Sequence, residues 1–309
     1  MSDQAETTRS QRGPGWLARR PGQAAAAWGL GYLLVALGGG LLVALLPPSV
    51  ATGVVVTVIA AIALLLSLLL VLSLCRLRVK AGSELVWVLG MTAVFCLVRP
   101  SVFAFAGRWL GYQEAGKRLA EGLAFVPHSL LLGNIVLIVW AAFLGRLVSR
   151  VIREGKLILP VAVVASIADI ITVFWGIVAR VTEAAPEVVQ TFSTSAAVEA
   201  PAGVTAPILT EVGIGDFLFL AMFLTVAIRY SMRATQALWA VFAVMLVAPL
   251  GFILWPEAPG LPGLPFISAA VLWPNWHYLE FTREEKRALL FAGALVVAVA
   301  LGVWTIFHR

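Results

Sequence analysis

Charged residues, cysteines and histidines are scarce in this chain. Only 12% of the 309 residues are charged, and there are two cysteines and three histidines. Cys75 and Cys96 lie in or at the ends of apolar runs without metal-ligand spacing, so we expect neither a disulfide framework nor a metal or other cofactor. The cations behind the formal net charge of +6 sit in short loops and form no basic patch interleaved with aromatics. We therefore expect no nucleic-acid partner.

Long apolar runs take the place of the missing charge. Hydrophobic residues make up 61% of the sequence, and the mean hydropathy is +0.97. These values are typical of polytopic membrane proteins, whose partner is the lipid bilayer. We predict an all-α membrane protein with about nine transmembrane helices, over residues 25–46, 50–74, 84–106, 125–148, 157–180, 208–229, 234–255, 264–281 and 288–307.

The runs divide the chain into four regions. We expect a disordered cytoplasmic tail over 1–24, a four-helix membrane region over 25–156, a core over 157–281 and a C-terminal helix over 282–309. Lys and Arg are concentrated in the loops on the side of the N-terminus. The positive-inside rule then predicts a cytoplasmic N-terminus, with the loop 181–206 outside. The compact chain favours the inner membrane of a prokaryote.

Two aspartates interrupt consecutive apolar segments of the core. Asp169 lies in the span 157–180 and Asp216 in the span 208–229. A carboxylate in hydrocarbon costs at least about 2.5 kcal/mol, so such residues mark functional sites. Counted from the outer ends of the two spans, the aspartates lie about 17 and 12 Å deep. Two neighbouring antiparallel helices would therefore hold both carboxyls at a similar level, and Gly213 leaves room for another backbone beside Asp216.

Two carboxyls a few ångströms apart in a low-dielectric site share one proton, because both cannot easily be ionised. This is the arrangement of aspartic proteases. One carboxylate takes a proton from a water that attacks a peptide carbonyl, and the protonated partner donates a hydrogen bond to the carbonyl oxygen. No Ser/His, Cys/His or His-Glu-x-x-His arrangement competes for the catalytic role.

Three short motifs occur in order along the core. They are Ala168-Asp169, then Gly213-Ile214-Gly215-Asp216, then Pro262-Gly263-Leu264. Together they resemble the presenilin and signal peptide peptidase family of intramembrane aspartyl proteases, whose marks are Tyr-Asp, Gly-x-Gly-Asp and Pro-Ala-Leu. Here alanine replaces the tyrosine of the first mark, and glycine replaces the alanine of the third.

The resemblance implies an endopeptidase that cleaves transmembrane helices or signal-peptide remnants within the bilayer. The extended stretch before the second aspartate would pair with an unwound substrate as an added β-strand, and water would reach the aspartates through a polar cavity. The resemblance implies catalytic roles for Asp169 and Asp216. It also implies roles in shaping the active site for Gly213, Gly215, Pro262, Gly263 and Leu264.

Two other functions fit parts of the pattern. An ion-coupled transporter could use the two aspartates as a proton relay, but such proteins are commonly built from internal repeats, and none is evident here. A prepilin-peptidase-like enzyme shares the Gly-x-Gly-Asp motif and has a polar segment after it. The corresponding residues 217–228 are continuously apolar in this chain.

Overall fold

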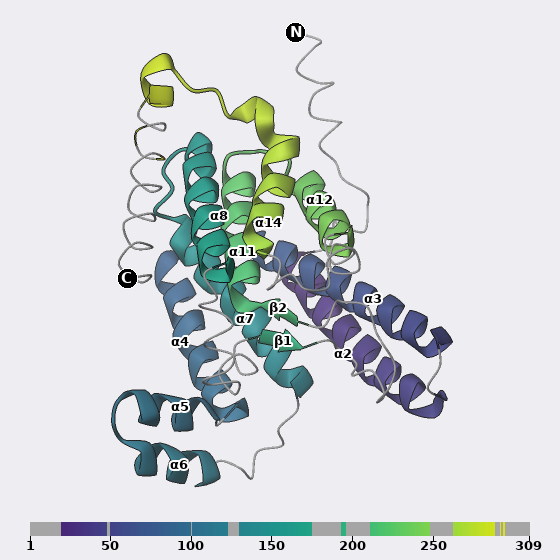
Figure 1. Cartoon of the computed structure of the whole chain (residues 1–309). Coiled ribbons are helices and arrows are strands. Elements are labelled where there is room, and N and C mark those ends of the chain that lie inside the picture. Colours follow the sequence, from purple (N-terminus) through teal and green to yellow (C-terminus); the bar gives the residue numbers. More distant parts are fainter. Residues whose placement is uncertain are drawn as a thin grey trace.

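The computed structural model describes residues 20–47, 50–99, 101–122, 130–174, 193–195, 211–247 and 262–287, together with Phe291 and Gly293. These residues are mostly helical, as expected (Figure 1). In chain order the elements are α2 (Pro21–Leu45), α3 (Val50–Cys75), α4 (Ala81–Val98), α5 (Ser101–Trp109), α6 (Gln113–Gly122), α7 (Leu130–Ser149), η2 (Gly155–Leu157), α8 (Ile158–Phe174), β1 (Ser193–Ser195), β2 (Glu211–Gly213), α11 (Ile214–Arg229), α12 (Ala234–Val247), α14 (Gly263–Leu272) and η3 (Trp273–Tyr278).

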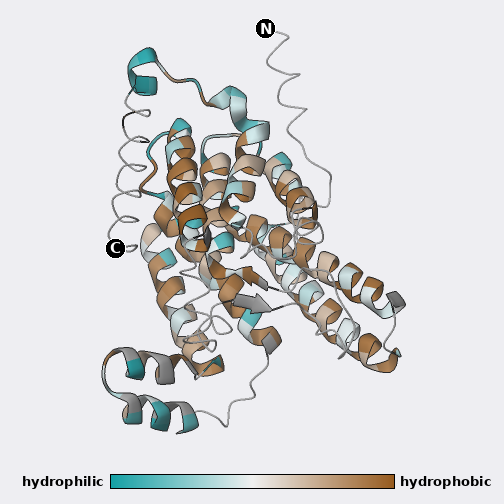
Figure 2. Ribbon diagram, in the orientation of Figure 1, coloured by the Kyte–Doolittle hydropathy of each residue, from teal (hydrophilic) through white to brown (hydrophobic). Residues whose placement is uncertain are grey.

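Five helical segments are long and apolar enough to cross a membrane. The protein is therefore embedded in a membrane, and the hydropathy colours show the apolar residues running along these helices (Figure 2). In the described part of the chain α11, α12 and α14 have 16, 14 and 10 residues. The nine-span count remains a prediction. The five long segments are Pro21–Leu45, Thr52–Cys75, Ala81–Val98, Leu131–Ser149 and Gly155–Val173.

The first and third predicted spans have different ends in the structure. Helix α2 already begins at Pro21, inside the expected tail. The span expected over 84–106 is divided, because α4 ends at Val98 and Arg99 has the non-helical dihedrals φ −125°, ψ 77°. The next residue in the sequence is Pro100, which disfavours a helical conformation for the residue before it. Helices α5 and α6 follow as a hairpin across the end of α4 (Figure 1).

The eighth predicted span is also interrupted. A kinked helix was expected over 264–281, but α14 ends at Leu272 and a 3-10 helix covers Trp273–Tyr278. Pro274 has no N–H to continue the α-helical hydrogen bonding, which accounts for the change. The tail over 1–19, most of the loop 181–206 and most of the last span lie outside the described residues.

Helix α7 is the centre of the packing. It contacts α3, α4 and α11, while α2 packs on α3. Gly145 of α7 lies against the backbone of α11, where a Cβ at Gly145 would collide with the Leu218 carbonyl oxygen and lie 2.9 Å from the Met222 nitrogen. Helix α11 is apolar, and its middle, residues 220–227, is buried on all sides, as expected for a segment that is hydrophobic all round. On the other side of the fold, α14 packs against α8, α11 and α12.

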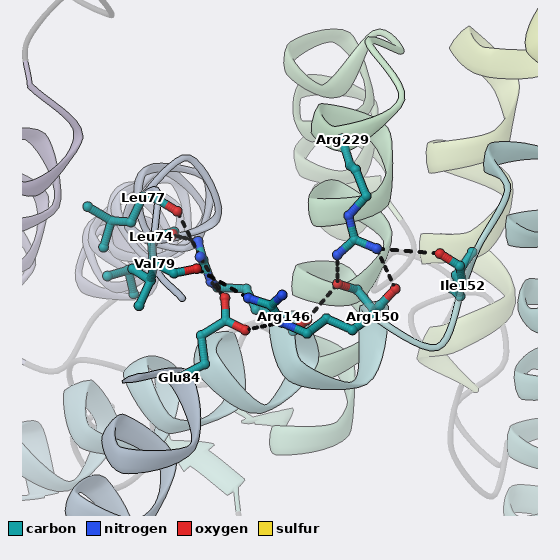
Figure 3. A network of polar contacts seen from close by, with 9 residues as sticks. Leu74, Leu77, Val79, Glu84, Arg146, Arg150, Ile152 and Arg229 are labelled. Carbon is teal, nitrogen blue, oxygen red and sulfur yellow. Dashed lines mark hydrogen bonds and ion pairs between the residues drawn. The ribbon is translucent and has the colours of Figure 1, made fainter. Parts of the chain in front are cut away.

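A buried ionic network joins the ends of α3, α4 and α7 (Figure 3). The Glu84 carboxylate accepts from Arg146 at 2.8 Å and from Arg150 at 2.6 Å. Arg146 also donates to the carbonyl of Leu74, in the last turn of α3, and to that of Leu77, just after the helix. Because Glu84 and Arg146 are almost completely buried, each compensates for the desolvation of the other.

Arg229 extends the same polar layer to the end of α11. Its guanidinium donates to the Ser149 carbonyl and to the Ser149 hydroxyl, each at 3.0 Å (Figure 3). The ends of α3, α7 and α11 and the start of α4 thus meet at one end of the bundle. The sequence places Arg146, Arg150 and Arg229 at or just beyond the ends of predicted spans, but it does not predict that they join α3, α4, α7 and α11.

Candidate active site

Asp216 lies in the first turn of α11, which corrects the predicted boundary of its span. A helix was expected from Ile208, but it begins at Ile214 after the strand β2. Gly213 is the N-cap residue, with φ −62° and ψ 144°. Its N–H donates a hydrogen bond to the Asp216 carboxylate three residues ahead. An acidic side chain that reaches back to the N-cap N–H is half of a capping box, so Asp216 also helps to start its own helix.

A short antiparallel sheet leads directly into Asp216. Ser193 pairs with Gly213, and Ser195 pairs with Glu211. By sequence, residues 187–194 and 204–209 are expected to be extended. Strand β1 overlaps the first of these stretches, and the second lies outside the described residues. The strand next to the aspartate is Glu211–Gly213 instead. Hydrogen bonds to β1 satisfy backbone N–H and C=O groups of residues 211–213, which would otherwise form helical hydrogen bonds.

Asp169 faces the start of α14. The Leu264 N–H donates to Asp169 Oδ2 at 2.9 Å, and the Gly263 N–H also donates to this carboxylate. Pro262, the N-cap of α14, has the extended dihedrals φ −63° and ψ 118°. The first N–H groups of a helix have no intrahelical acceptor, and the helix dipole favours negative charge there. The α14 N-terminus therefore gains an acceptor, and Asp169 gains two donors.

Gly263 touches the second carboxyl as well. A Cβ at this position would lie 2.9 Å from Asp216 Oδ1 and 3.1 Å from Oδ2. The carboxylates of Asp169 and Asp216 are also close enough to interact electrostatically. The Pro262–Leu264 turn thus contacts both aspartates, which come from helices that α14 separates along most of their length.

The two aspartates lie at similar depth, although the outer helix ends differ from those expected. Asp169 comes 11 residues after Ile158, the start of α8, and Asp216 comes 13 residues before Arg229, the end of α11. At 1.5 Å per residue these separations are about 17 and 20 Å. Both carboxyls therefore lie at similar distances from these helix ends, a little more than half the thickness of a hydrocarbon core of about 30 Å.

The remaining predicted positions have no direct contact with a carboxylate. A Cβ at Gly215 would have no neighbour within 4 Å. Ala168, which stands where the resembling family has tyrosine, is exposed. Within the described ranges, no group of three or more His, Cys, Asp or Glu side chains is arranged to hold a metal ion.

Two features of the site were not foreseen from the sequence. The donors to Asp169 are backbone N–H groups, which no side-chain motif reveals. The collision that a Cβ at Gly263 would make with Asp216 also escaped sequence reasoning, although the replacement of the family's alanine by glycine was a visible signal. Comparison with known proteins finds no matching family model, and no curated protein or solved structure that is significantly similar to this chain.

Proposed function

We propose that this protein is an intramembrane aspartyl protease that cleaves transmembrane peptides through Asp169 and Asp216. One observation supports this function above the others. Two aspartates that are 47 residues apart in the sequence approach each other at the N-terminus of a third helix, α14, inside a membrane protein. The same three segments carry the marks that resemble the presenilin and signal peptide peptidase family.

In the proposed reaction the two carboxyls hold one proton between them. The ionised carboxyl takes a proton from a water, and the oxygen of that water attacks the carbonyl carbon of the scissile peptide bond. The protonated carboxyl donates a hydrogen bond to the carbonyl oxygen as negative charge develops there. Collapse of the tetrahedral intermediate breaks the C–N bond, and the leaving nitrogen takes up a proton. No metal or cofactor enters this scheme.

The strand β2 provides a plausible surface for the substrate. A transmembrane helix hides its peptide bonds in internal hydrogen bonds, so it must unwind before cleavage. The two-stranded sheet ends at Gly213, which is exposed and three residues before Asp216. An unwound substrate could add to this sheet as a further strand and bring its peptide bond to the aspartates.

The strand β2 also indicates how water could reach the two aspartates. Non-helical backbone at membrane depth occurs where protein covers it or where it lines a water-filled cavity. The start of α11 lies about 24 Å from its inner end at 1.5 Å per residue, so the end of β2 that joins α11 lies below the outer surface of a core about 30 Å thick. We infer a polar cavity that opens on the outer half of the bilayer.

For the whole chain we propose nine spans, a core similar to that of signal peptide peptidases, and a location in a prokaryotic inner membrane. The N-terminus would be cytoplasmic and the loop 181–206 external. The ionic network of Glu84, Arg146 and Arg150 would then lie on the cytoplasmic side. This side agrees with the preference of arginine for cytoplasmic helix ends.

The decisive experiment is cleavage of a transmembrane reporter peptide by the purified protein in lipid vesicles. Asp169→Ala and Asp216→Ala should each abolish cleavage, while thermal unfolding and gel-filtration profiles remain those of a folded protein. Glu114→Ala is the matched control, because it removes an exposed carboxylate of α6 and should leave cleavage unchanged.

The outcomes separate the proposed function from its rivals. Cleavage that persists in either aspartate variant would remove the proposed mechanism. A vesicle assay that shows proton-coupled solute uptake, lost in the same variants and without peptide cleavage, would favour the transporter. Cleavage only of substrates with a cytoplasmic leader segment would favour a prepilin-peptidase-like enzyme.

A further inference from the structure

We propose that the two aspartates have different resting states, with Asp169 as the ionised carboxylate and Asp216 as the carboxylic acid, and that Gly263 sets this difference. This division of roles rests on the proposed protease function for its chemical meaning. It makes Asp169 the group that takes the proton from water, and Asp216 the group that donates to the substrate carbonyl.

The first argument is the number of hydrogen-bond donors at each carboxyl. Asp169 accepts from two backbone N–H groups, those of Leu264 and Gly263, at the N-terminus of α14. Asp216 accepts from one backbone N–H, that of Gly213. Hydrogen bonds from N–H groups stabilise the charged form of a carboxyl, and each additional donor adds to the effect. Asp169 is therefore the better site for the single negative charge.

The second argument is the position of Gly263 between the carboxyls. Its N–H donates to Asp169, while the direction of its absent side chain is occupied by the Asp216 carboxyl, 2.9 Å from a Cβ there. The Gly263 Cα lies one bond length behind this Cβ position, so no water can occupy that side of the Asp216 carboxyl. Exclusion of water disfavours the charged form. One residue thus favours charge on Asp169 and a proton on Asp216.

Other ionisable groups do not offset the preference for charge on Asp169 and a proton on Asp216. Asp169 is the only titratable residue in α8, and α14 and α12, which packs on α14, contain none. Helix α11 adds Arg229, which is 13 residues from Asp216 and is held by Ser149 at the other end of the helix. Helices α3 and α7 also pack on α11, and they carry Cys75 and Arg146 at that same end, where Arg146 is paired with Glu84. Strand β2 carries Glu211, five residues before Asp216, and an acidic residue there does not favour charge on Asp216. Among these packed helices, the charge on each aspartate is therefore governed by its partner and by the backbone donors.

The test compares Asp169→Asn and Asp216→Asn by their affinity for a hydroxyl-containing transition-state analogue of aspartyl proteases. The analogue hydroxyl donates to the ionised carboxyl and accepts from the protonated one. An asparagine amide can replace a protonated carboxyl as donor, but in place of a carboxylate it offers only an uncharged and weaker acceptor. Asp216→Asn should keep the wild-type affinity to within a few-fold, whereas Asp169→Asn should lose about ten- to a hundredfold, the worth of a charged hydrogen bond.

A second measurement does not depend on protease function. Asp169→Asn removes the charge that two N–H groups and the α14 dipole stabilise, so its melting temperature should fall by several degrees. Asp216→Asn replaces a carboxylic acid with a neutral group of similar shape and should melt near the wild type. Equal or reversed effects in the affinity series would overturn the assignment.

If the wild type neither binds the analogue nor cleaves a reporter, the proposed function fails, and the melting temperatures alone decide the assignment. A lower melting temperature for Asp169→Asn than for Asp216→Asn would support the assignment. Equal melting temperatures, or the opposite order, would refute it.

Discussion

The substitution Gly263→Ala should reduce protease activity, although it restores the residue that the resembling family has at this position. A Cβ at residue 263 would lie 2.9 Å from Asp216 Oδ1, 3.1 Å from Oδ2 and 3.2 Å from Cγ. Ordinary carbon–oxygen contacts begin near 3.4 Å, so the Asp216 carboxyl or the α14 backbone must move by about half an ångström. Asp216 has little freedom to do so, because the Gly213 N–H holds it from the other side.

The size of the loss follows from the sensitivity of reacting groups to position. A displacement of about 1 Å costs on the order of a hundredfold in rate, so half of that distance costs about tenfold in kcat/KM. The backbone N–H of residue 263 remains, and the hydrogen bonds to Asp169 should therefore survive. We expect the loss mainly in kcat, because the proposed substrate strand lies at β2 rather than at Gly263.

The assay is steady-state cleavage of a transmembrane reporter in lipid vesicles, with thermal unfolding measured on the same preparations. Gly90→Ala is the matched control, because Gly90 is exposed on α4 and a Cβ there meets nothing within 4 Å. Full activity of Gly263→Ala, with a normal melting temperature, would refute the close contact between residue 263 and Asp216. It would also remove the second argument for unequal aspartates.

Three further predictions concern stability and substrate approach. Glu84→Gln should lower the free energy of unfolding by about 3–5 kcal/mol, because it leaves the buried Arg146 without a carboxylate. Glu114→Gln, at an exposed site, should not, and similar melting curves for the two would contradict the network. Gly145→Ala should lower the free energy of unfolding by about 1–3 kcal/mol, because the added methyl group overpacks α7 against α11. Chemical denaturation measures this loss, and the control Gly90→Ala should show none. Gly215→Ala should leave the melting temperature unchanged, since a Cβ there has open space, but should raise KM several-fold; a fall in kcat alone would argue against a substrate backbone at this position.

The sequence was informative about the class of protein and about which residues to examine. Apolar runs of membrane length predicted helices that the structure contains, because a backbone in hydrocarbon must satisfy its own hydrogen bonds. Aspartates in such runs are too costly to be incidental. Hence Asp169 and Asp216 could be singled out from residue types and order alone, whereas the Pro262–Leu264 turn was singled out by its resemblance to a family motif.

Helix ends were less predictable, and the reason is visible at α11. Residues 208–213, Ile-Leu-Thr-Glu-Val-Gly, mix apolar and polar side chains without a clear period, so this short stretch does not distinguish helix from strand. In the structure Glu211–Gly213 pairs with Ser193–Ser195, a segment about 18 residues away in the chain. That pairing, rather than any preference of the residues, moves Asp216 from the interior of a helix to its first turn.

Composition and order of residues by themselves determined that this is a helical membrane protein with one aspartate in each of two apolar segments. Only the tertiary structure decided that Glu84 is buried between two arginines, that Asp169 is bound by the backbone of α14, and that Gly263 touches Asp216. The physical reason is that hydropathy acts residue by residue, whereas hydrogen bonds and collisions depend on which distant segments the packing brings within about 3 Å of each other.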